Sequence, residues 1–187
     1  MARPDRTRRS LLDAATLVLS KDSGASLAEV ASVAGVGRTT LHRYFPTRDA
    51  LISALVLDAL DRVAQAITDA KPEHGTVLEA LQRTADTVIP LGPSLRFLHA
   101  EPSVYTTEDI MRRWYDALEP VAAAVRRGQV DGSIRRDLPV TWVVDLFAGA
   151  ILTAWDSVDD GRLAPNEAPR LVLSSVLHGV ASKTGTT

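Results

Sequence analysis

Apolar positions in this chain recur with the period of an α-helix over almost every long segment. Between residues 6 and 21, for example, Leu11, Leu12, Ala15 and Leu19 fall on one stripe. The same spacing predicts further helices over residues 27–34, 38–44, 47–70, 76–89, 94–100, 106–129, 140–158 and 166–182. No stretch shows the sustained alternation of apolar and polar residues that a half-buried strand requires. The sequence therefore predicts an all-α fold of about nine helices.

Local signals mark where several of these helices begin and end. Ser26 and Glu29 have the spacing of a capping box, in which each side chain bonds the backbone amide of the other residue. Gly35 can take the positive φ that ends a helix without a Cβ penalty, and Pro46 stops the next helix. We expect Pro120 to kink or interrupt the helix that contains it, because proline lacks the amide donor.

Residues 27–45, LAEVASVAGVGRTTLHRYF, are the most informative segment. A short helix, a glycine turn and a second short helix that begins with small polar and basic residues are typical of a helix-turn-helix. Leu41 and either Tyr44 or Phe45 have the spacing to anchor the second helix to the core. The positions left facing outward are then Gly37, Arg38, Thr39, Thr40, His42 and Arg43.

The outward residues are of types that contact double-stranded DNA. Groove-reading helices place their N-terminal residues at base edges, and arginine is the commonest specific partner of guanine. Threonine hydroxyls can donate to phosphate, and Arg48 lies at the start of the following helix, whose N-terminus attracts an anion. We therefore expect DNA contacts from Ser26, Gly37, Arg38, Thr39, Thr40, His42, Arg43, Tyr44 and Arg48.

The distribution of charge agrees with this interpretation. The whole chain has 21 basic and 23 acidic residues and a net charge of −2, which by itself does not suggest a nucleic-acid partner. Residues 1–48, however, hold eight basic and four acidic residues, so this end is net positive and the remainder net negative. Such an asymmetry directs one end of a protein towards phosphate, although an excess of four charges alone is weak evidence.

The segment SLAEVASVAGVGRTTLHRYFPTRDALI closely resembles the DNA-binding module of the TetR/AcrR family of transcriptional repressors. Members typically show a G-V-S turn, then T-L-Y-x-Y-F, then a helix start similar to K-E-x-L. The chain matches this pattern at Gly35, Val36, Thr40, Leu41, Tyr44, Phe45, Arg48 and Leu51. It departs at Gly37, where the family often has serine and a phosphate contact is lost. It departs also at His42, where tyrosine is usual and histidine can make the equivalent contact.

The resemblance is strong over residues 6–55 and looser beyond, and it implies two domains. A three-helix DNA-binding domain over residues 1–50 is then followed by a helical domain over residues 51–187 that binds a small molecule and dimerises. Residues 132–163 are similar to the region in which the last two helices of many members build the dimer interface. The implied function is that of a repressor released from a pseudo-palindromic operator by a small-molecule effector.

The larger domain contains bulky residues that suit a ligand cavity. Three tryptophans in an otherwise aromatic-poor chain fit an apolar pocket, and a histidine can orient a polar group of the ligand. We therefore expect an apolar or aromatic effector to contact Phe97, His99, Met111, Trp114, Leu118, Trp142, Phe147 and Trp155. For any one of these residues, ordinary core packing is the better explanation.

The last two predicted helices are rich in small and branched residues, including Ala148, Gly149 and Ala150 on one and Ser174 and Ser175 on the other. Their apolar content exceeds what one buried face needs. A four-helix bundle formed by two such pairs would bury the excess, and packing within one chain is the alternative. A pseudo-palindromic operator needs two recognition helices, which favours the homodimer.

Several functional classes lack any motif in this chain. There is no cysteine, and we find no glycine-rich phosphate loop, paired-histidine metal motif or G-x-S-x-G elbow, so we expect no enzyme, metal or cofactor. The most apolar segment, residues 140–155, is interrupted by Asp145 and is too short to span a bilayer. No export signal is evident at the N-terminus, and we expect a cytoplasmic protein without a membrane partner.

One rival hypothesis remains, a helical small-molecule-binding protein with an inactive helix-turn-helix. Outward-facing Arg38, Arg43 and Arg48 argue against it, because a module that never meets DNA has no need of them. Specific and salt-sensitive DNA binding would separate the two hypotheses.

Overall fold

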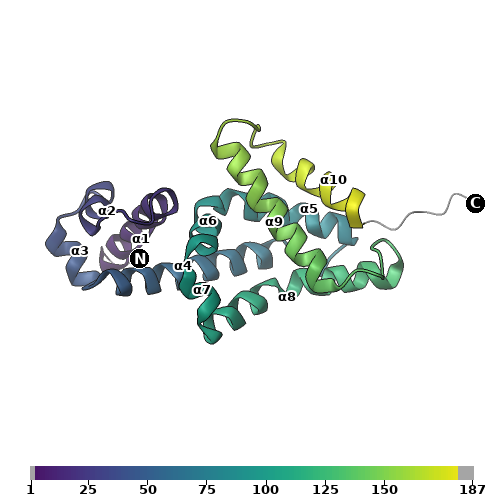
Figure 1. The fold of residues 1–187 in the computed structure, drawn as a ribbon, viewed down its shortest axis with the longest axis horizontal. Helices are drawn as coiled ribbons and strands as arrows, with labels where there is room; N and C mark the ends of the chain where they lie inside the picture. The colour runs from purple at the N-terminus through teal and green to yellow at the C-terminus, as the bar shows by residue number, and fades with distance from the viewer. Residues whose placement is uncertain (1–2, 181–187) are drawn as a thin grey trace, which may run out of the picture. The chain divides into compact units, whose positions relative to one another are not determined.

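The computed structural model describes residues 3–180, and the fold within them is all-α, as the sequence predicts (Figure 1). Its N-terminal helices are α1 (Arg3–Lys21), α2 (Leu27–Val33), α3 (Arg38–Tyr44) and α4 (Arg48–Asp69). The chain continues through α5 (Val77–Val88), the 3₁₀ turn η1 (Ile89–Leu91), α6 (Gly92–Ala100), α7 (Pro102–Thr106), α8 (Glu108–Asp131), α9 (Val140–Asp159) and α10 (Ala168–Val180). The nine predicted helices are all present, with the ends that can be compared shifted by a few residues at most; the end predicted at residue 182 lies outside the described residues.

Helix α7 is the one α-helix within the described residues that the periodicity did not predict. It has only five residues, too few to show a helical period. Pro102 occupies its first turn, where the missing amide costs nothing. The carboxylate of Glu101 caps it by accepting from the amide of Ser103 at 3.2 Å.

Of the two outcomes expected at Pro120, a kink or an interruption, the interruption does not occur, because α8 is helical from Glu108 to Asp131 with Pro120 inside it. One proline removes a single hydrogen bond, whereas α8 buries an apolar face on both sides of that position. Ala117, Leu118 and Val121 are among its buried residues. Most helical stability in proteins comes from such packing, which here outweighs the lost bond.

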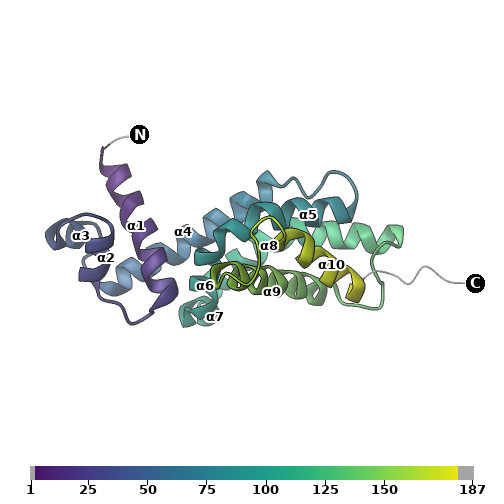
Figure 2. The ribbon, with the colours of Figure 1, turned by 90° about the horizontal axis from the view of Figure 1, so that it is seen from above.

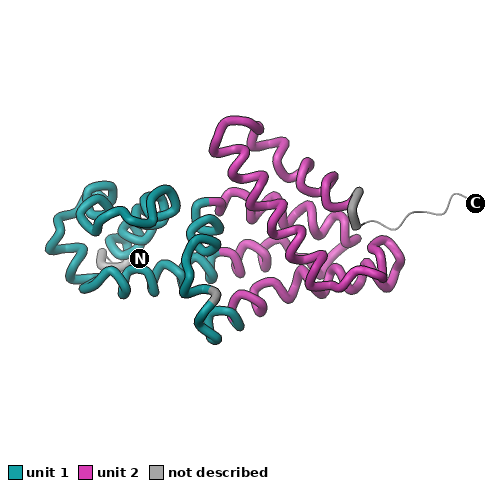
Figure 3. Tube along the Cα trace, in the orientation of Figure 1, with its two compact units in different colours: residues 1–62, 93–112 teal, residues 63–92, 113–187 magenta. Residues whose placement is uncertain are grey.

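By packing, the chain divides into two compact units (Figure 3). Unit 1 comprises residues 1–62 and 93–112, and unit 2 comprises residues 63–92 and 113–187. The sequence predicts a boundary between two domains after residue 50. These units are defined by packing alone, so that domain boundary stays a prediction.

Unit 1 contains the predicted helix-turn-helix. Helix α2 packs against both α1 and α3, and Figures 1 and 2 show it between them. The interior is built from the apolar stripes that the sequence predicts on these helices and on the first turns of α4. Its fully buried side chains include Leu11, Leu12, Val30, Leu41, Leu51 and Leu55.

Unit 2 is a helical body in which α10 packs against both α9 and α5. Two arginines hold the connection between α4 and α5. Arg83 donates to the carbonyls of Ala70, Lys71 and His74 at 2.7–2.9 Å, and Arg127 donates to that of Pro72 at 2.6 Å. These bonds supply donors to carbonyls of the irregular backbone, of which that of Lys71 also accepts from the His74 amide at 3.1 Å. In the described part of the chain, no helix has the length and apolar content to cross a membrane.

Candidate nucleic-acid interface

The start of α2 is fixed by the capping box that the sequence predicts. The amide of Glu29 donates to Ser26 Oγ at 3.2 Å, and the Ser26 amide donates to Glu29 Oε2 at 2.6 Å. The backbone bond from Ser26, followed by the bond with its side chain, lowers the pKa of Glu29. Ser26 therefore orients α2, and its predicted contact with DNA remains an expectation.

The turn between α2 and α3 is a Schellman motif centred on Gly35. The Gly35 φ is +67°, the amide of Val36 donates to the Ala31 carbonyl at 3.0 Å, and that of Gly35 donates to Ser32 at 3.1 Å. The positive φ predicted for Gly35 is confirmed. This geometry turns the chain sharply, and α3 begins three residues later.

Helix α3 has one buried side and one exposed side. Leu41 is 1% exposed and Phe45, the residue that ends the helix, is 3% exposed. Of the two alternatives for the second anchor, Phe45 is therefore the buried one, and Tyr44 is half-buried. The predicted DNA-facing residues are largely open to solvent: Thr40 is half-buried, and the others are exposed, namely Gly37, Arg38, Thr39, His42 and Arg43.

Two arginines are held over aromatic rings at the end of α3. The guanidinium carbon of Arg43 lies 5.4 Å from the centroid of the Tyr44 ring, and that of Arg8, on α1, lies 5.8 Å from the Phe45 centroid. Arg43 was among the predicted contacts, and the position of Tyr44 beneath it gives the ring a supporting role. Arg8 was not among the predicted contacts, because nothing in the sequence around a single arginine on α1 indicates that it lies beside α3.

Arg48 has partners within unit 1 that the sequence did not predict. Its guanidinium donates to the carbonyls of Ser23 and Ala25, the latter at 2.5 Å, and so holds the connection between α1 and α2. Thr47 caps α4, since the Ala50 amide donates to its hydroxyl at 3.1 Å. The predicted phosphate contact of Arg48 therefore adds to a structural role that this residue already has.

The structure does not place the eight expected effector contacts together within one unit. Phe97, His99 and Met111 belong to unit 1, where Phe97 is buried and His99 exposed. The remaining five belong to unit 2: Leu118, Phe147 and Trp155 are buried, Trp114 is half-buried and Trp142 is 58% exposed. The predicted effector contacts of these residues stay predictions.

Phe97 lines a partly open cavity of about 220 Å³ within unit 1. Leu19 and Ile52 add apolar surface, and Arg48 and Glu101 add polar groups. Both of these polar side chains already form hydrogen bonds, Arg48 to carbonyls and Glu101 to the Ser103 amide. Within the described residues, no group of three or more histidine, cysteine, aspartate or glutamate side chains could hold a metal ion.

Comparison with known proteins identifies the family of this chain. Residues 11–55 match the model of the bacterial regulatory proteins of the tetR family. The chain is also 31% identical, over 94% of its length and 91% of the relative, to the HTH-type transcriptional repressor LfrR of Mycolicibacterium smegmatis. The chain belongs to the TetR family. It is accordingly an HTH-type transcriptional regulator, and the all-α fold with an N-terminal helix-turn-helix is that of the family.

Two further likenesses support this membership over the whole chain. The HTH-type transcriptional regulator NfxB of Pseudomonas aeruginosa is 30% identical over 92% of this chain and 93% of that protein. The crystal structure of LfrR from Mycobacterium smegmatis in complex with proflavine has a TM-score of 0.79 at 30% identity. That match covers 95% of this chain and 99% of the other. TetR-family regulators bind DNA and respond to ligands, so the family as a whole agrees with the function predicted from the sequence.

Proposed function

We propose that this TetR-family regulator is a dimeric repressor that reads a pseudo-palindromic operator with α3. The observation that carries the proposal is that α3 buries Leu41 and exposes Arg38, Thr39 and Arg43, of which Thr39 and Arg43 lie on the side opposite Leu41. Each subunit inserts this face in the major groove, at half-sites roughly 34–36 Å apart. Arg38 and Arg43 read base edges, and the hydroxyl of Thr39 donates to phosphate.

The dimer forms through the last two helices. Trp142, Leu146, Gly149 and Thr153 follow one another at helical spacing along α9, and all four are exposed in the single chain. Leu171 on α10, which packs against α9, is 46% exposed. An exposed apolar stripe on a packed helix pair is typical of an oligomer interface. The open space above Gly149 admits the close approach of a partner helix.

The effector is an apolar or aromatic molecule. LfrR, which is 30% identical in the structural comparison, has been solved with proflavine bound. Within unit 2, the candidate contacts are the predicted side chains of Trp114, Leu118, Phe147 and Trp155. The ligand shifts the protein to a state in which the two helix-turn-helix modules no longer match the spacing of the half-sites. The extent of DNA release is limited by how much more tightly the ligand binds that state than the DNA-bound state.

Selection from a random duplex library, followed by titration of the recovered DNA at two salt concentrations, tests DNA recognition. We expect one enriched palindromic sequence, bound at least about 10³ times more tightly than scrambled DNA and weakened steeply by salt. No enrichment would leave the rival, a helical small-molecule-binding protein with an inactive helix-turn-helix. Proflavine added to the complex then tests the effector class, and release of the DNA is the expected result.

Analytical ultracentrifugation of Gly149→Arg tests the dimer. An arginine fits the open space above Gly149 in the single chain, but it places a charge in the proposed interface. We expect a folded monomer, and the matched control Thr106→Arg, exposed on α7, should remain a dimer. A dimer in both variants would show that α9 is not the interface.

A further inference from the structure

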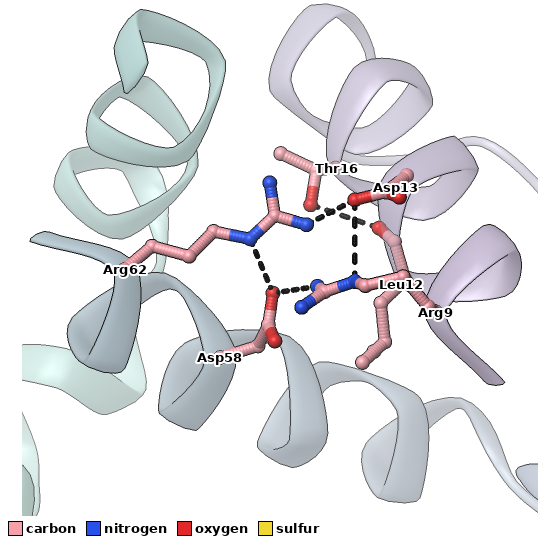
Figure 4. Close-up of polar contacts among 6 residues, drawn as sticks. All are labelled: Arg9, Leu12, Asp13, Thr16, Asp58 and Arg62. Carbon is pink, nitrogen blue, oxygen red and sulfur yellow. Dashed lines mark hydrogen bonds and ion pairs between the residues drawn. The ribbon is translucent and has the colours of Figure 1, made fainter. Parts of the chain in front are cut away.

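Four charged side chains form a closed ring between α1 and α4 (Figure 4). Arg9 and Asp13 lie one turn apart on α1, and Asp58 and Arg62 lie one turn apart on α4. Between the helices, Arg9 Nη2 donates to Asp58 Oδ2, and Arg62 Nη2 donates to Asp13 Oδ1. Within them, Arg62 Nε lies 2.9 Å from Asp58 Oδ2 and Arg9 Nε lies 3.5 Å from Asp13 Oδ1. Each charge thus has a partner of opposite sign on both helices.

The ring is partly shielded from water. Asp58 is the most buried member, with its side chain 15% exposed, and Asp13 the least, at 48%. Few residues of α1 and α4 approach closely along their backbones, so these long side chains bridge the gap. Networks that fix several charged groups in one geometry hold helices in place better than isolated surface pairs do.

The ring gives α4 a further point of attachment to the helix-turn-helix. The start of α4 is already held by the connection through residues 45–47, by the bonds from Arg48 to the carbonyls of Ser23 and Ala25, and by the buried side chains of Leu51 and Leu55. Asp58 lies ten residues beyond Arg48, or about 15 Å along the helix axis. An attachment at that distance opposes rotation of α4 about the contacts near its start. Arg62 is also the last residue of unit 1 on this uninterrupted helix.

On its other side, α1 is joined to the recognition helix. Arg8, next to Arg9, lies over the ring of Phe45 at the end of α3, and α2 packs between α1 and α3. The direction of α3 is therefore tied to α1, and through the ring to the stretch of α4 around Asp58.

We propose that Arg9, Asp13, Asp58 and Arg62 are positioning residues that set the direction of the recognition helix relative to α4. They touch no DNA. Their contribution to DNA affinity appears only when two recognition helices bind two half-sites at once, because an operator of fixed spacing requires both recognition helices to have the correct direction. This inference rests on the proposed dimeric repressor.

Exchanging charges within one helix tests the ring without changing net charge. Arg9→Asp with Asp13→Arg keeps the intrahelical pair on α1 but makes both interhelical pairs repulsive. Asp58→Arg with Arg62→Asp does the same from α4, and all four exchanges together restore a ring of reversed polarity. Binding is measured to the selected two-half-site operator, to a duplex with one half-site, and to operators lengthened or shortened by one base pair.

We expect each two-residue exchange to weaken two-half-site binding about tenfold and to change one-half-site binding by less than about twofold. The spacing series should lose its single optimum, and the four-residue exchange should recover both affinity and optimum. A parallel fall in one-half-site and two-half-site binding would overturn the proposal, because it would mean that the ring only maintains folded protein. So would unchanged binding to both.

Asp58→Asn provides a milder variant if an exchange prevents folding, since it removes the negative charge that both arginines share without placing a like charge against them. Asp69→Asn, an exposed position further along α4, makes the same change of charge and serves as its control. Asp58→Asn should lower the ratio of two-site to one-site affinity, and Asp69→Asn should not. Failure of the wild-type protein to select any DNA would count against the proposed function, whereas an unchanged ratio counts against the ring alone.

Discussion

The indole of Trp155 lies directly against Gly92 within unit 2. A Cβ atom built on Gly92 would be 1.7 Å from Trp155 Cδ1 and 1.9 Å from Nε1, far inside van der Waals contact. Gly92 is the first residue of α6, and its φ of −44° is one that any residue adopts. Close approach of the indole, not backbone conformation, is therefore why glycine is needed at this position.

Gly92→Ala should consequently destabilise the protein by about 1–3 kcal/mol, the usual cost of forcing an extra methyl group into a packed site. The free energy of unfolding in urea measures this. Trp155→Leu makes room for the methyl group, so Gly92→Ala should cost less in that background. An equal cost in both backgrounds would show that the indole is not the obstacle.

Gly35 and Gly37, two residues apart, should respond in opposite directions to the same substitution. Gly35 has a φ of +67°, so Gly35→Ser should cost about 1–2 kcal/mol of stability. Gly37 precedes α3 with a φ of −72° and open space around it, and it has no side-chain cap. Gly37→Ser supplies that cap and should add a few tenths of a kcal/mol.

The serine at position 37 should also strengthen operator binding, because it restores a hydroxyl where many family members carry one. Thermal unfolding and operator titration of both variants check the pair of expectations. Weaker DNA binding by Gly37→Ser would mean that the backbone at this position approaches the DNA too closely for a side chain.

Features that depend on a few neighbouring residues could be predicted from the sequence, and features that depend on distant partners could not. Ser26 with Glu29 and the positive φ of Gly35 are set by residues within one or two turns, and the structure confirms both. Arg48 shows the opposite case, since its carbonyl partners lie 23 and 25 positions away. From the sequence, the position of Arg48 at the start of a helix predicted only a contact with a DNA phosphate.

The ring between α1 and α4 shows the same limit. The pairs Arg9 with Asp13 and Asp58 with Arg62 are visible in the sequence as opposite charges four residues apart, a common feature of exposed helices. Nothing in that spacing indicates that the two pairs meet across 49 residues. Trp142 was likewise assigned to a pocket from its residue type, and only the fold shows that it is exposed.

Acid should weaken α2 and α5 through their capping carboxylates. Backbone and side-chain bonds from Ser26 lower the pKa of Glu29 below its ordinary value of 4.5, and Thr76 does the same for Glu79. A carboxyl with a depressed pKa in the folded state stabilises that state above its unfolded pKa. The stabilisation is lost as the pH falls through the folded value.

An NMR titration of the glutamate side-chain carbonyls should therefore show both residues titrating at lower pH in folded than in urea-unfolded protein. Ser26→Ala removes only the side-chain bond and keeps the backbone donor, which is the larger cause. The pKa of Glu29 should accordingly rise part of the way, while that of Glu79 stays unchanged. A full return to the unfolded value would assign the whole shift to the hydroxyl.

Arg38 and Arg48 should differ in what their loss costs. Arg38 is exposed on α3, so Arg38→Ala should change stability by less than about 0.5 kcal/mol and weaken operator binding by about 1–3 kcal/mol. Arg48 also holds the carbonyls of Ser23 and Ala25. Arg48→Ala should therefore lower stability by about 1.5–3 kcal/mol as well as weakening binding.

Salt dependence separates the two contributions to DNA binding. If Arg48 contacts a phosphate, its loss should reduce the slope of log K against log salt by about 0.9, whereas loss of a base contact by Arg38 should instead relax sequence preference. Urea unfolding and operator titration at several salt concentrations provide both readouts. An Arg48→Ala protein with lowered stability but an unchanged slope would confine Arg48 to its role between α1 and α2, and the phosphate contact would have to come from another residue.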